Sequence, residues 1–159
     1  MIFHPIAPIY NKESKILILG SFPSVKSREA CFFYGHPQNR FWKVLAAVFG
    51  DATPETVAEK KAFLLKNKVA LWDVIAACDI EGSADQSIKN AIANDIAPIL
   101  AESRIEKIYV NGGTAKKLYD RHIYPNIARE AQVLPSTSPA NAAWSLERLI
   151  EAWKTIAED

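Results

Sequence analysis

Residues 16–49 read ILILGSFPSVKSREACFFYGHPQNRFWKVLAAVF, and the rest of the chain is interpretable as a scaffold around them. The stretch opens with the apolar run Ile16 to Gly20, which charge precedes and Ser and Pro follow, as is typical of a strand buried on both faces. In the next loop, GSFPS, Gly20 lets the backbone approach a ligand closely and Pro23 fixes φ. Ligands of open α/β sheets bind at the carboxyl ends of such strands, so we expect this loop to belong to a site.

The second half of the stretch, FFYGHPQNRFW over residues 32–42, is rich in aromatic and amide side chains. Five aromatics alternate with an amide pair, one His and one Arg. This composition suits stacking on flat rings combined with hydrogen bonds to their edges, as in nucleic-acid recognition. An aromatic loop packed on the core is the alternative, because aromatic residues also dominate cores.

The remaining chain predicts an alternation of strands and helices. We expect residues 1–15 to be an extended lead-in without regular structure. Predicted strands cover 16–19, 69–75, 105–110 and a short stretch ending at Val133 and Leu134. Predicted helices cover residues from 39 or 40 to 49, 53–66 with Thr53 as N-cap before Pro54, 88–100, a segment that follows a turn and cap at 111–114 and runs through 124, and 142–156. This order predicts one α/β domain over residues 1–159, with a parallel four-stranded sheet between helices.

Composition narrows the function without deciding it. The chain has 159 residues, 49% of them hydrophobic, and no apolar run long enough for a membrane span, so we expect a cytoplasmic monomer. Two cysteines and three histidines show no metal-ligand spacing, which favours chemistry without a metal or another cofactor. The net charge is only +1, but residues 1–50 hold six basic and two acidic side chains, so the positive charge gathers around the aromatic segment.

Three motifs together, GSFPS, FFYGHPQNRFW and LPSTSPAN near the C-terminus, resemble the uracil-DNA glycosylase superfamily and, within it, the hypoxanthine-DNA (deoxyinosine) glycosylase family. The resemblance covers about residues 16–154. It implies a three-layer sandwich and an enzyme that flips deaminated bases out of DNA, hydrolyses the N-glycosidic bond and leaves an abasic site. Hypoxanthine is the first expected base, and a uracil or mismatch glycosylase is the alternative.

The resemblance also implies a base pocket at the strand ends. We expect it to comprise Gly20, Ser21, Phe22, Pro23, Phe33, Tyr34 and Asn111. Many relatives carry a water-activating Asp or Asn at the position of Phe22. The ring of Phe22 can neither orient a water molecule nor deprotonate it. Since Phe22 lacks that chemistry, a non-catalytic nucleic-acid-binding domain is the alternative from another class. A small-molecule enzyme is a third interpretation, which the lack of a GxGxxG or GxxxxGKS loop weakens.

Two residues are the predicted catalytic pair. Asn39 lies in the QNRFW context where the hypoxanthine family places its catalytic Asn, and its carbonyl can position a water. Alternatively, Asn39 is only the N-cap of the following helix. Asp73 takes the place where relatives have a base-reading Asn, so its carboxylate either accepts from N1–H of hypoxanthine or acts as general base.

The predicted DNA contacts come from both motif loops. Small hydroxyl side chains in PSTSPAN suit phosphate binding without bulk, and Asn141 is a candidate to fill the gap left by the flipped base. The full predicted set is Ser24, Arg28, His36, Arg40, Ser136, Thr137, Ser138 and Asn141. Alternatively, the serines are only turn residues and do not contact DNA.

Overall fold

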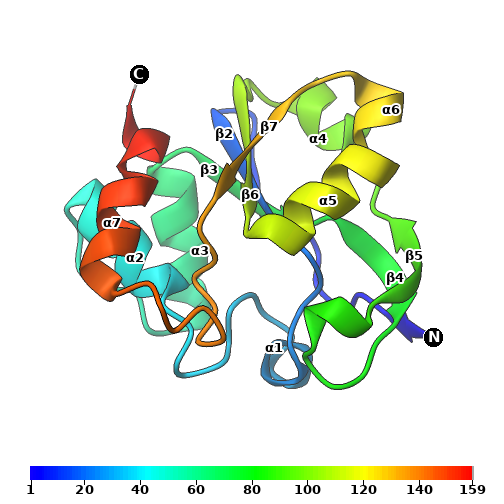
Figure 1. The fold of residues 1–159 in the computed structure, drawn as a ribbon. Coiled ribbons are helices and arrows are strands. Elements are labelled where there is room, and N and C mark those ends of the chain that lie inside the picture. The colour runs from blue at the N-terminus through cyan, green and yellow to red at the C-terminus, as the bar shows by residue number, and fades with distance from the viewer. Residues whose placement is uncertain (159) are drawn as a thin grey trace.

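Four parallel strands in the order β3-β2-β6-β7 form the central sheet of the computed structural model, which describes residues 1–158 (Figure 1). They are β2 (Ile16–Gly20), β3 (Val69–Asp73), β6 (Lys107–Asn111) and β7 (Ala131–Leu134). The register pairs Gly20 with Asp73, and Asn111 with Leu134. The predicted parallel four-stranded sheet is therefore confirmed, and all four strands end at one edge.

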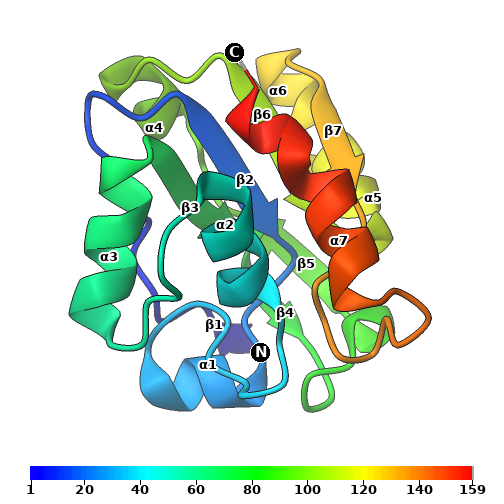
Figure 2. The same cartoon turned by 90° about the vertical axis from the view of Figure 1, so that its left-hand side faces the viewer.

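Alternation along β2 explains why helices cover both faces of this sheet. Ile16 and Ile18 join one apolar cluster and Leu17 and Leu19 the other, and all four are buried. The first face is covered by α2 (Phe41–Phe49), α3 (Val57–Lys66) and α7 (Leu146–Trp153) (Figure 2). The second is covered by α4 (Ala97–Glu102), α5 (Gly113–His122) and α6 (Tyr124–Ile127).

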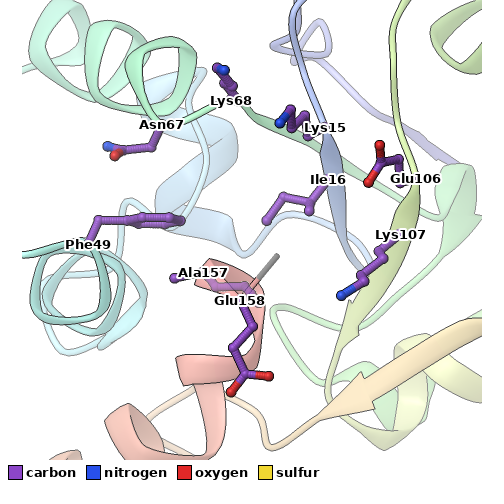
Figure 3. A pocket seen from close by; sticks show the side chains of 10 residues that line it. Lys15, Ile16, Phe49, Asn67, Lys68, Glu106, Lys107, Ala157 and Glu158 are labelled. Carbon is purple, nitrogen blue, oxygen red and sulfur yellow. The ribbon is translucent and has the colours of Figure 1, made fainter.

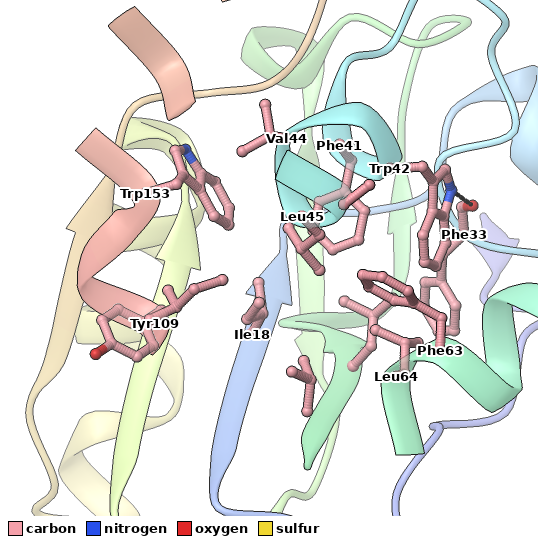
Figure 4. Packing of buried hydrophobic residues seen from close by; sticks show 14 of the residues in the cluster. Ile18, Phe33, Phe41, Trp42, Val44, Leu45, Phe63, Leu64, Tyr109 and Trp153 are labelled. Carbon is pink, nitrogen blue, oxygen red and sulfur yellow. Dashed lines mark hydrogen bonds between the residues drawn. The ribbon is translucent and has the colours of Figure 1, made fainter. Parts of the chain in front are cut away.

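The first-face cluster fixes the aromatic segment that leads into α2. Phe41 and Leu45 point from α2 toward Ile18, and Trp153 of α7 closes the cluster from the other side (Figure 4). Trp42 donates its indole N–H to the carbonyl oxygen of Phe33 at 3.3 Å. Replacing a buried aromatic of this kind by Ala costs about 3–5 kcal/mol, so part of the segment serves packing.

A second sheet, absent from the sequence prediction, lies beside the first. It is antiparallel, in the order β1-β4-β5, and comprises β1 (Ile2–Phe3), β4 (Ile75–Asp79) and β5 (Lys89–Ala93). The strand predicted over 69–75 therefore ends at Asp73, and the chain changes sheets at Val74. The helix predicted over 88–100 is wrong. Its isoleucines repeat at helical spacing, but β5 is an edge strand paired with β4, and only 97–102 is helical.

The lead-in is also more ordered than predicted. The backbone N–H of His4 donates to Ala76 O at 2.8 Å, and Ile9 exchanges two backbone hydrogen bonds with Leu71 at 3.0 and 2.9 Å. Residues 1–10 thus cover the free edges of β3 and β4, where unpaired backbone groups would otherwise face solvent. Their side chains are brought to the strand ends by this pairing.

Several helix ends differ from the prediction. The first residue of α3 follows Thr56, whose hydroxyl accepts from Glu59 N, so Thr53 is not the cap. Ser145 caps α7, which passes into the 3₁₀ turn η2 (Lys154–Ala157). The predicted helix over 112–124 divides at Ile123 into α5 and α6. Two short elements were not predicted, α1 (Val25–Ala30) and the 3₁₀ turn η1 (Asp85–Ser87). No helix within residues 1–158 is long and apolar enough to span a membrane.

Candidate active site

A cleft of about 1020 Å³ opens at the carboxyl ends of the parallel strands. The loops after β2, β6 and β7 and the last residue of β3 line it, together with the aromatic segment and residues 83–86 in and before η1. Of the predicted site residues, the lining includes Gly20, Ser21, Phe22, Pro23, Ser24, Phe33, Tyr34, His36, Asn39, Asp73, Asn111, Ser136, Thr137, Ser138 and Asn141. Arg28 and Arg40 are the two predicted residues that it does not include.

Gly20, Asp73 and Tyr34 meet in one corner of this cleft. A Cβ built on Gly20 would lie 2.4 Å from Oδ1 of Asp73 and 2.9 Å from the hydroxyl of Tyr34. No real side chain tolerates such contacts, so position 20 must be glycine for these two groups to come together. The corner thus combines a carboxylate oxygen with a phenol.

Asp73 is 4% exposed, and its partner comes from the lead-in. Oδ2 lies 2.7 Å from Nε2 of His4, which is buried as well. A buried carboxylate needs such a partner to offset its desolvation. His4 was not predicted as a site residue, because nothing in its local sequence indicates a partner 69 positions away.

Tyr34 is held by an unusual backbone conformation and by ring stacking. Its φ of 53° lies in the left-handed region, which costs a non-glycine residue about 1–2 kcal/mol. Its ring stacks on Phe41 with centroids 4.0 Å apart, and its hydroxyl accepts from Nδ2 of Asn111 at 3.1 Å. Burial, and then the charge of Asp73, raise the pKa of Tyr34 far above its ordinary value. The phenol therefore stays protonated, with its O–H available to donate.

A chain of hydrogen bonds continues from Asn111 to Asn39. Asn111 Nδ2 donates to Oγ1 of Thr137 at 3.0 Å, and that hydroxyl donates to Oδ1 of Asn39 at 2.9 Å. Oδ1 also accepts from the backbone N–H of Phe41 at 2.9 Å, at the start of α2. Both lone pairs of the Asn39 carbonyl are thus occupied in this structure, although the sequence predicts that this oxygen positions a water. Within residues 1–158 the amide nitrogen Nδ2 has no partner, and it is the free group of Asn39.

A second acid, Asp85, enters the cleft from η1 and was not predicted. Its Oδ2 accepts from the hydroxyl of Ser21 at 2.8 Å. Burial raises the pKa of Asp85 most, the nearby charge of Asp73 raises it further, and the Ser21 hydrogen bond lowers it. A raised pKa from burial and a like charge is typical of carboxylates in functional clefts.

The loop after β7 is held in place by Arg40 from the aromatic segment. The guanidinium donates to the carbonyl oxygens of Ser138 at 2.9 Å and Asn141 at 3.1 Å, and also to that of Trp144. Arg40 is therefore bonded to this loop and fixes it, whereas the sequence predicts that Arg40 contacts a DNA phosphate. Thr137 is fully buried, so its hydroxyl belongs to the internal network and is out of reach of a DNA phosphate in this conformation.

Two other predicted DNA contacts, Arg28 and His36, are held by different partners. Arg28 donates to Gly82 O at 2.7 Å and lies 5.7 Å from the ring centroid of Phe22, so it braces the cleft wall from behind. His36 accepts the backbone N–H of Gln38 on Nδ1 at 3.1 Å. No group of three or more His, Cys, Asp or Glu in the part of the chain that the structure describes is placed to hold a metal ion.

A smaller hollow of about 430 Å³ lies at the opposite, amino ends of the strands (Figure 3). Its walls carry the side chains of Lys15, Lys68, Lys107, Glu106 and Glu158 around Phe49. These charged groups are exposed. None of the predicted site residues belongs to it.

The comparisons with known proteins address the whole chain. A family model described as the Uracil DNA glycosylase superfamily matches residues 7–157. The chain belongs to this superfamily. It is therefore a DNA glycosylase, a hydrolase that acts on DNA, and the cleft at the strand ends is its candidate active site.

Named relatives refine the comparison. A protein from Methanosarcina acetivorans called "Hypoxanthine DNA glycosylase" is 33% identical over 158 residues, which is 98% of each chain. A protein of the same description from Methanosarcina barkeri is 33% identical over 141 residues, 84% of this chain and 85% of its own. A solution NMR structure from Methanosarcina acetivorans, provisionally described as a uracil DNA glycosylase, superposes with a TM-score of 0.83 at 31% identity, covering 99% of this chain and 97% of the other.

Proposed function

We propose that this glycosylase removes hypoxanthine from DNA that contains deoxyinosine, by flipping the nucleotide into the strand-end cleft and attacking its sugar with water. The observation that carries this proposal is that Asp73 Oδ1 and the Tyr34 hydroxyl both lie against Gly20, in the same corner of the cleft. Two relatives described as hypoxanthine DNA glycosylases, similar over most of their length, support it.

The edge of hypoxanthine fits this pair. N1–H is a donor for the Asp73 carboxylate, and the adjacent O6 is an acceptor for the Tyr34 O–H, which burial keeps protonated. Adenine presents the opposite pattern, an N1 acceptor and an N6 donor, so both contacts would be lost. A site that leaves its buried polar groups unpaired rejects the wrong substrate by as much as 10⁴- to 10⁵-fold.

Bond cleavage then requires a water and a stable leaving base. Asn39 lies in the cleft lining with Nδ2 free, and we assign this N–H to hold the attacking water by donating to its oxygen. A dissociative reaction at the sugar needs the water in position more than it needs a strong base. The described lining of the cleft contains no lysine that would form a Schiff base, which supports simple hydrolysis to an abasic site.

The rim of the cleft is the proposed surface that binds the DNA duplex. Ser24, His36, Ser136, Ser138 and Asn141 line the cleft and are partly exposed, so they remain the proposed contacts to phosphates and to the gap in the stack. Arg40 keeps the loop of Ser136, Ser138 and Asn141 in a fixed shape, so this loop needs little ordering on binding.

A uracil preference is the second candidate. Uracil also presents an imino N–H beside a carbonyl, so the same Asp73 and Tyr34 contacts are available to it, and the solved relative is described as a uracil DNA glycosylase. The difference lies in size, since a purine fills more of the cleft than a pyrimidine does.

Single-turnover excision on labelled duplexes with one hypoxanthine, uracil, xanthine or adenine tests the proposal, with alkali added afterwards to reveal abasic sites. Fastest release of hypoxanthine and none of adenine is the expected result. Release of uracil alone would transfer the specificity to the second candidate. Tight binding to these duplexes without any release would support a non-catalytic DNA-binding domain.

A further inference from the structure

His4 occupies a closed compartment behind Asp73. Its side chain is 3% exposed and that of Asp73 is 5% exposed. The imidazole lies among three aromatic rings, edge-on to Phe22 at 5.9 Å and to Trp72 at 6.2 Å, and tilted against Phe33 at 6.2 Å. Two of these rings, Phe22 and Phe33, also line the cleft. The compartment therefore adjoins the active site while excluding solvent from His4.

The two ring nitrogens of His4 have different partners, and these define its protonation. The backbone N–H of Ile6 points at Nδ1 from 3.1 Å. Since a backbone N–H only donates, Nδ1 must accept and carries no proton. The remaining nitrogen, Nε2, then carries the ring proton and donates it to Oδ2 of Asp73 at 2.7 Å. In this arrangement His4 is a neutral donor.

We propose that His4 is the positioning residue of the glycosylase, which fixes the Asp73 carboxylate so that Oδ1 faces the base. The proposal rests on the proposed function, in which Asp73 reads the base edge. His4 holds Oδ2 from behind, and Gly20 leaves room for Oδ1 in front. The carboxylate can therefore neither rotate nor retreat, and a neutral partner leaves its negative charge directed at the imino N–H of the substrate.

This role differs from that of a general base or of a fold anchor. A general base needs a free nitrogen lone pair near the water, and His4 has none, because Nδ1 is engaged by Ile6 and Nε2 bears the proton. A fold anchor would act through the same Nε2–Asp73 hydrogen bond, because His4 and Ile6 both belong to the lead-in and this bond ties the His4 ring to β3. Its loss would therefore lower thermal stability, whereas loss of a positioning residue lowers the excision rate of a protein that stays folded. The two nitrogens can be separated experimentally.

Two substitutions separate them. His4→Gln places an amide N–H near the position of Nε2, so it retains a donor to Asp73 but loses the acceptor for Ile6. His4→Asn places an amide oxygen near the position of Nδ1, so it retains that acceptor but does not reach Asp73. Loss of a hydrogen bond to a charged group corresponds to a rate decrease of roughly 10- to 100-fold.

Single-turnover excision of hypoxanthine, measured together with DNA affinity and thermal unfolding, distinguishes the roles. We expect His4→Asn to lose roughly 10- to 100-fold in the excision rate at unchanged DNA affinity, and His4→Gln to recover most of the loss. A loss of excision by His4→Asn that only follows a matching loss of thermal stability would overturn the proposal in favour of a fold anchor, and so would His4→Asn active with His4→Gln impaired, which would exclude the donor on Nε2. Equal activity of both variants with the wild type would overturn it as well.

Histidine nitrogen NMR on the folded wild type needs no variant to fold. We expect the His4 ring to show a protonated Nε2 and an unprotonated Nδ1, and the reverse tautomer or a doubly protonated ring would overturn the proposal. Asp73→Ala separates the two levels of the account. If Asp73→Ala excises hypoxanthine normally, the proposed function of Asp73 fails; if it is inactive while His4→Asn is normal, only the positioning role fails.

Discussion

The two ends of the parallel sheet differ in how they treat polar groups. At the carboxyl ends, Asp73 and Thr137 are buried and bonded to other side chains. At the amino ends, Lys15, Lys68 and Lys107 surround a hollow of about 430 Å³ and are exposed to solvent (Figure 3). Both ends are hollowed and both carry charge, but the carboxylate of Asp73 is buried, whereas the lysines around the hollow at the amino ends are exposed.

The difference in burial between the two ends matters because buried and exposed polar groups differ in their energetic cost. An unbonded buried polar group costs about 1–3 kcal/mol, whereas an exposed lysine costs almost nothing. The carboxyl end contains a hydrogen-bonded network of amide, hydroxyl and carboxylate groups, and removal of any member would leave a buried partner unbonded. It also contains Tyr34 in a strained backbone conformation. Such an arrangement is stable only where the surroundings determine it fully, and strained buried groups cluster at functional sites.

Asn39→Ala should have the largest effect at the carboxyl end. It removes the Nδ2 donor assigned to the water, and loss of one positioned donor lowers a rate on the order of 10²- to 10³-fold. The Phe41 N–H also loses its acceptor. Asn39→Asp is the matched control, since it keeps an acceptor for Phe41 and replaces only the amide nitrogen. Single-turnover rates as slow for Asn39→Asp as for Asn39→Ala support the Nδ2 role, and a normal rate for Asn39→Asp contradicts it.

Gly20→Ala should follow, with a loss of about 10²-fold, because the added carbon displaces Asp73 Oδ1 and the Tyr34 hydroxyl by around an ångström. Excision rates and thermal unfolding measure this effect. Gly113→Ala is the control for stability, because a Cβ there meets no atom within 4 Å. Unchanged excision by Gly20→Ala would show that Asp73 and Tyr34 need not stand together.

The pH dependence of stability sharpens the comparison between an acid in the cleft, Asp85, and one outside it, Asp51. Burial raises the pKa of Asp85 above its ordinary value of 3.8, so the folded state holds the proton more tightly and Asp85 destabilises the fold as pH rises through that pKa. Asp85→Asn should therefore stabilise the protein at pH 7 more than at pH 3.

Asp51 affects the pH dependence of stability in the opposite direction. Hydrogen bonds from Lys66 and Asn67 lower its pKa below 3.8, so its contribution is present above pH 3.8 and is lost as pH falls through the lowered pKa. Asp51→Asn should lower stability at pH 7 and have no effect in acid. Chemical unfolding at several pH values measures both, and the same sign for the two variants would contradict the burial of Asp85.

The amino end should give the smallest effect. Lys15→Ala and Lys107→Ala, alone or together, should change excision less than twofold and stability by about 0.5 kcal/mol or less, as for ordinary surface positions. DNA affinity and unfolding free energy are the measurements. A marked loss of DNA binding would mean that this end contacts DNA, and the contrast between the two ends would fail.

The sequence predicted the parallel sheet because its strands are short, continuously apolar and bounded by polar residues. It also predicted the cleft lining, since loops after parallel strands converge. The second sheet was missed because β5 carries isoleucines at helical spacing, and pairing with β4 overrides this local pattern. Tertiary contacts decide such short segments.

The site residues that were missed have partners distant in sequence. His4 finds Asp73 through edge pairing of the lead-in, and Asp85 reaches Ser21 from a turn without apolar periodicity. Asn39 and Thr137 are predicted site residues that line the cleft, but the direction of their hydrogen bonds was not predictable. Residue type indicates that a side chain suits a site, whereas the partner of each atom follows only from the folded chain.

The most direct test of the account is the ratio of hypoxanthine to uracil excision for wild type and Asp73→Asn, measured in single turnover together with DNA affinity. If Asp73 reads the imino N–H, the amide of Asn can accept from that N–H and also donate to the second carbonyl that flanks it in uracil, where hypoxanthine has only C2–H. The ratio of hypoxanthine to uracil excision then falls while DNA affinity stays near that of the wild type. An unchanged ratio, or a loss explained entirely by weaker DNA binding, would contradict the claim that the buried corner of Gly20, Tyr34 and Asp73 selects the base.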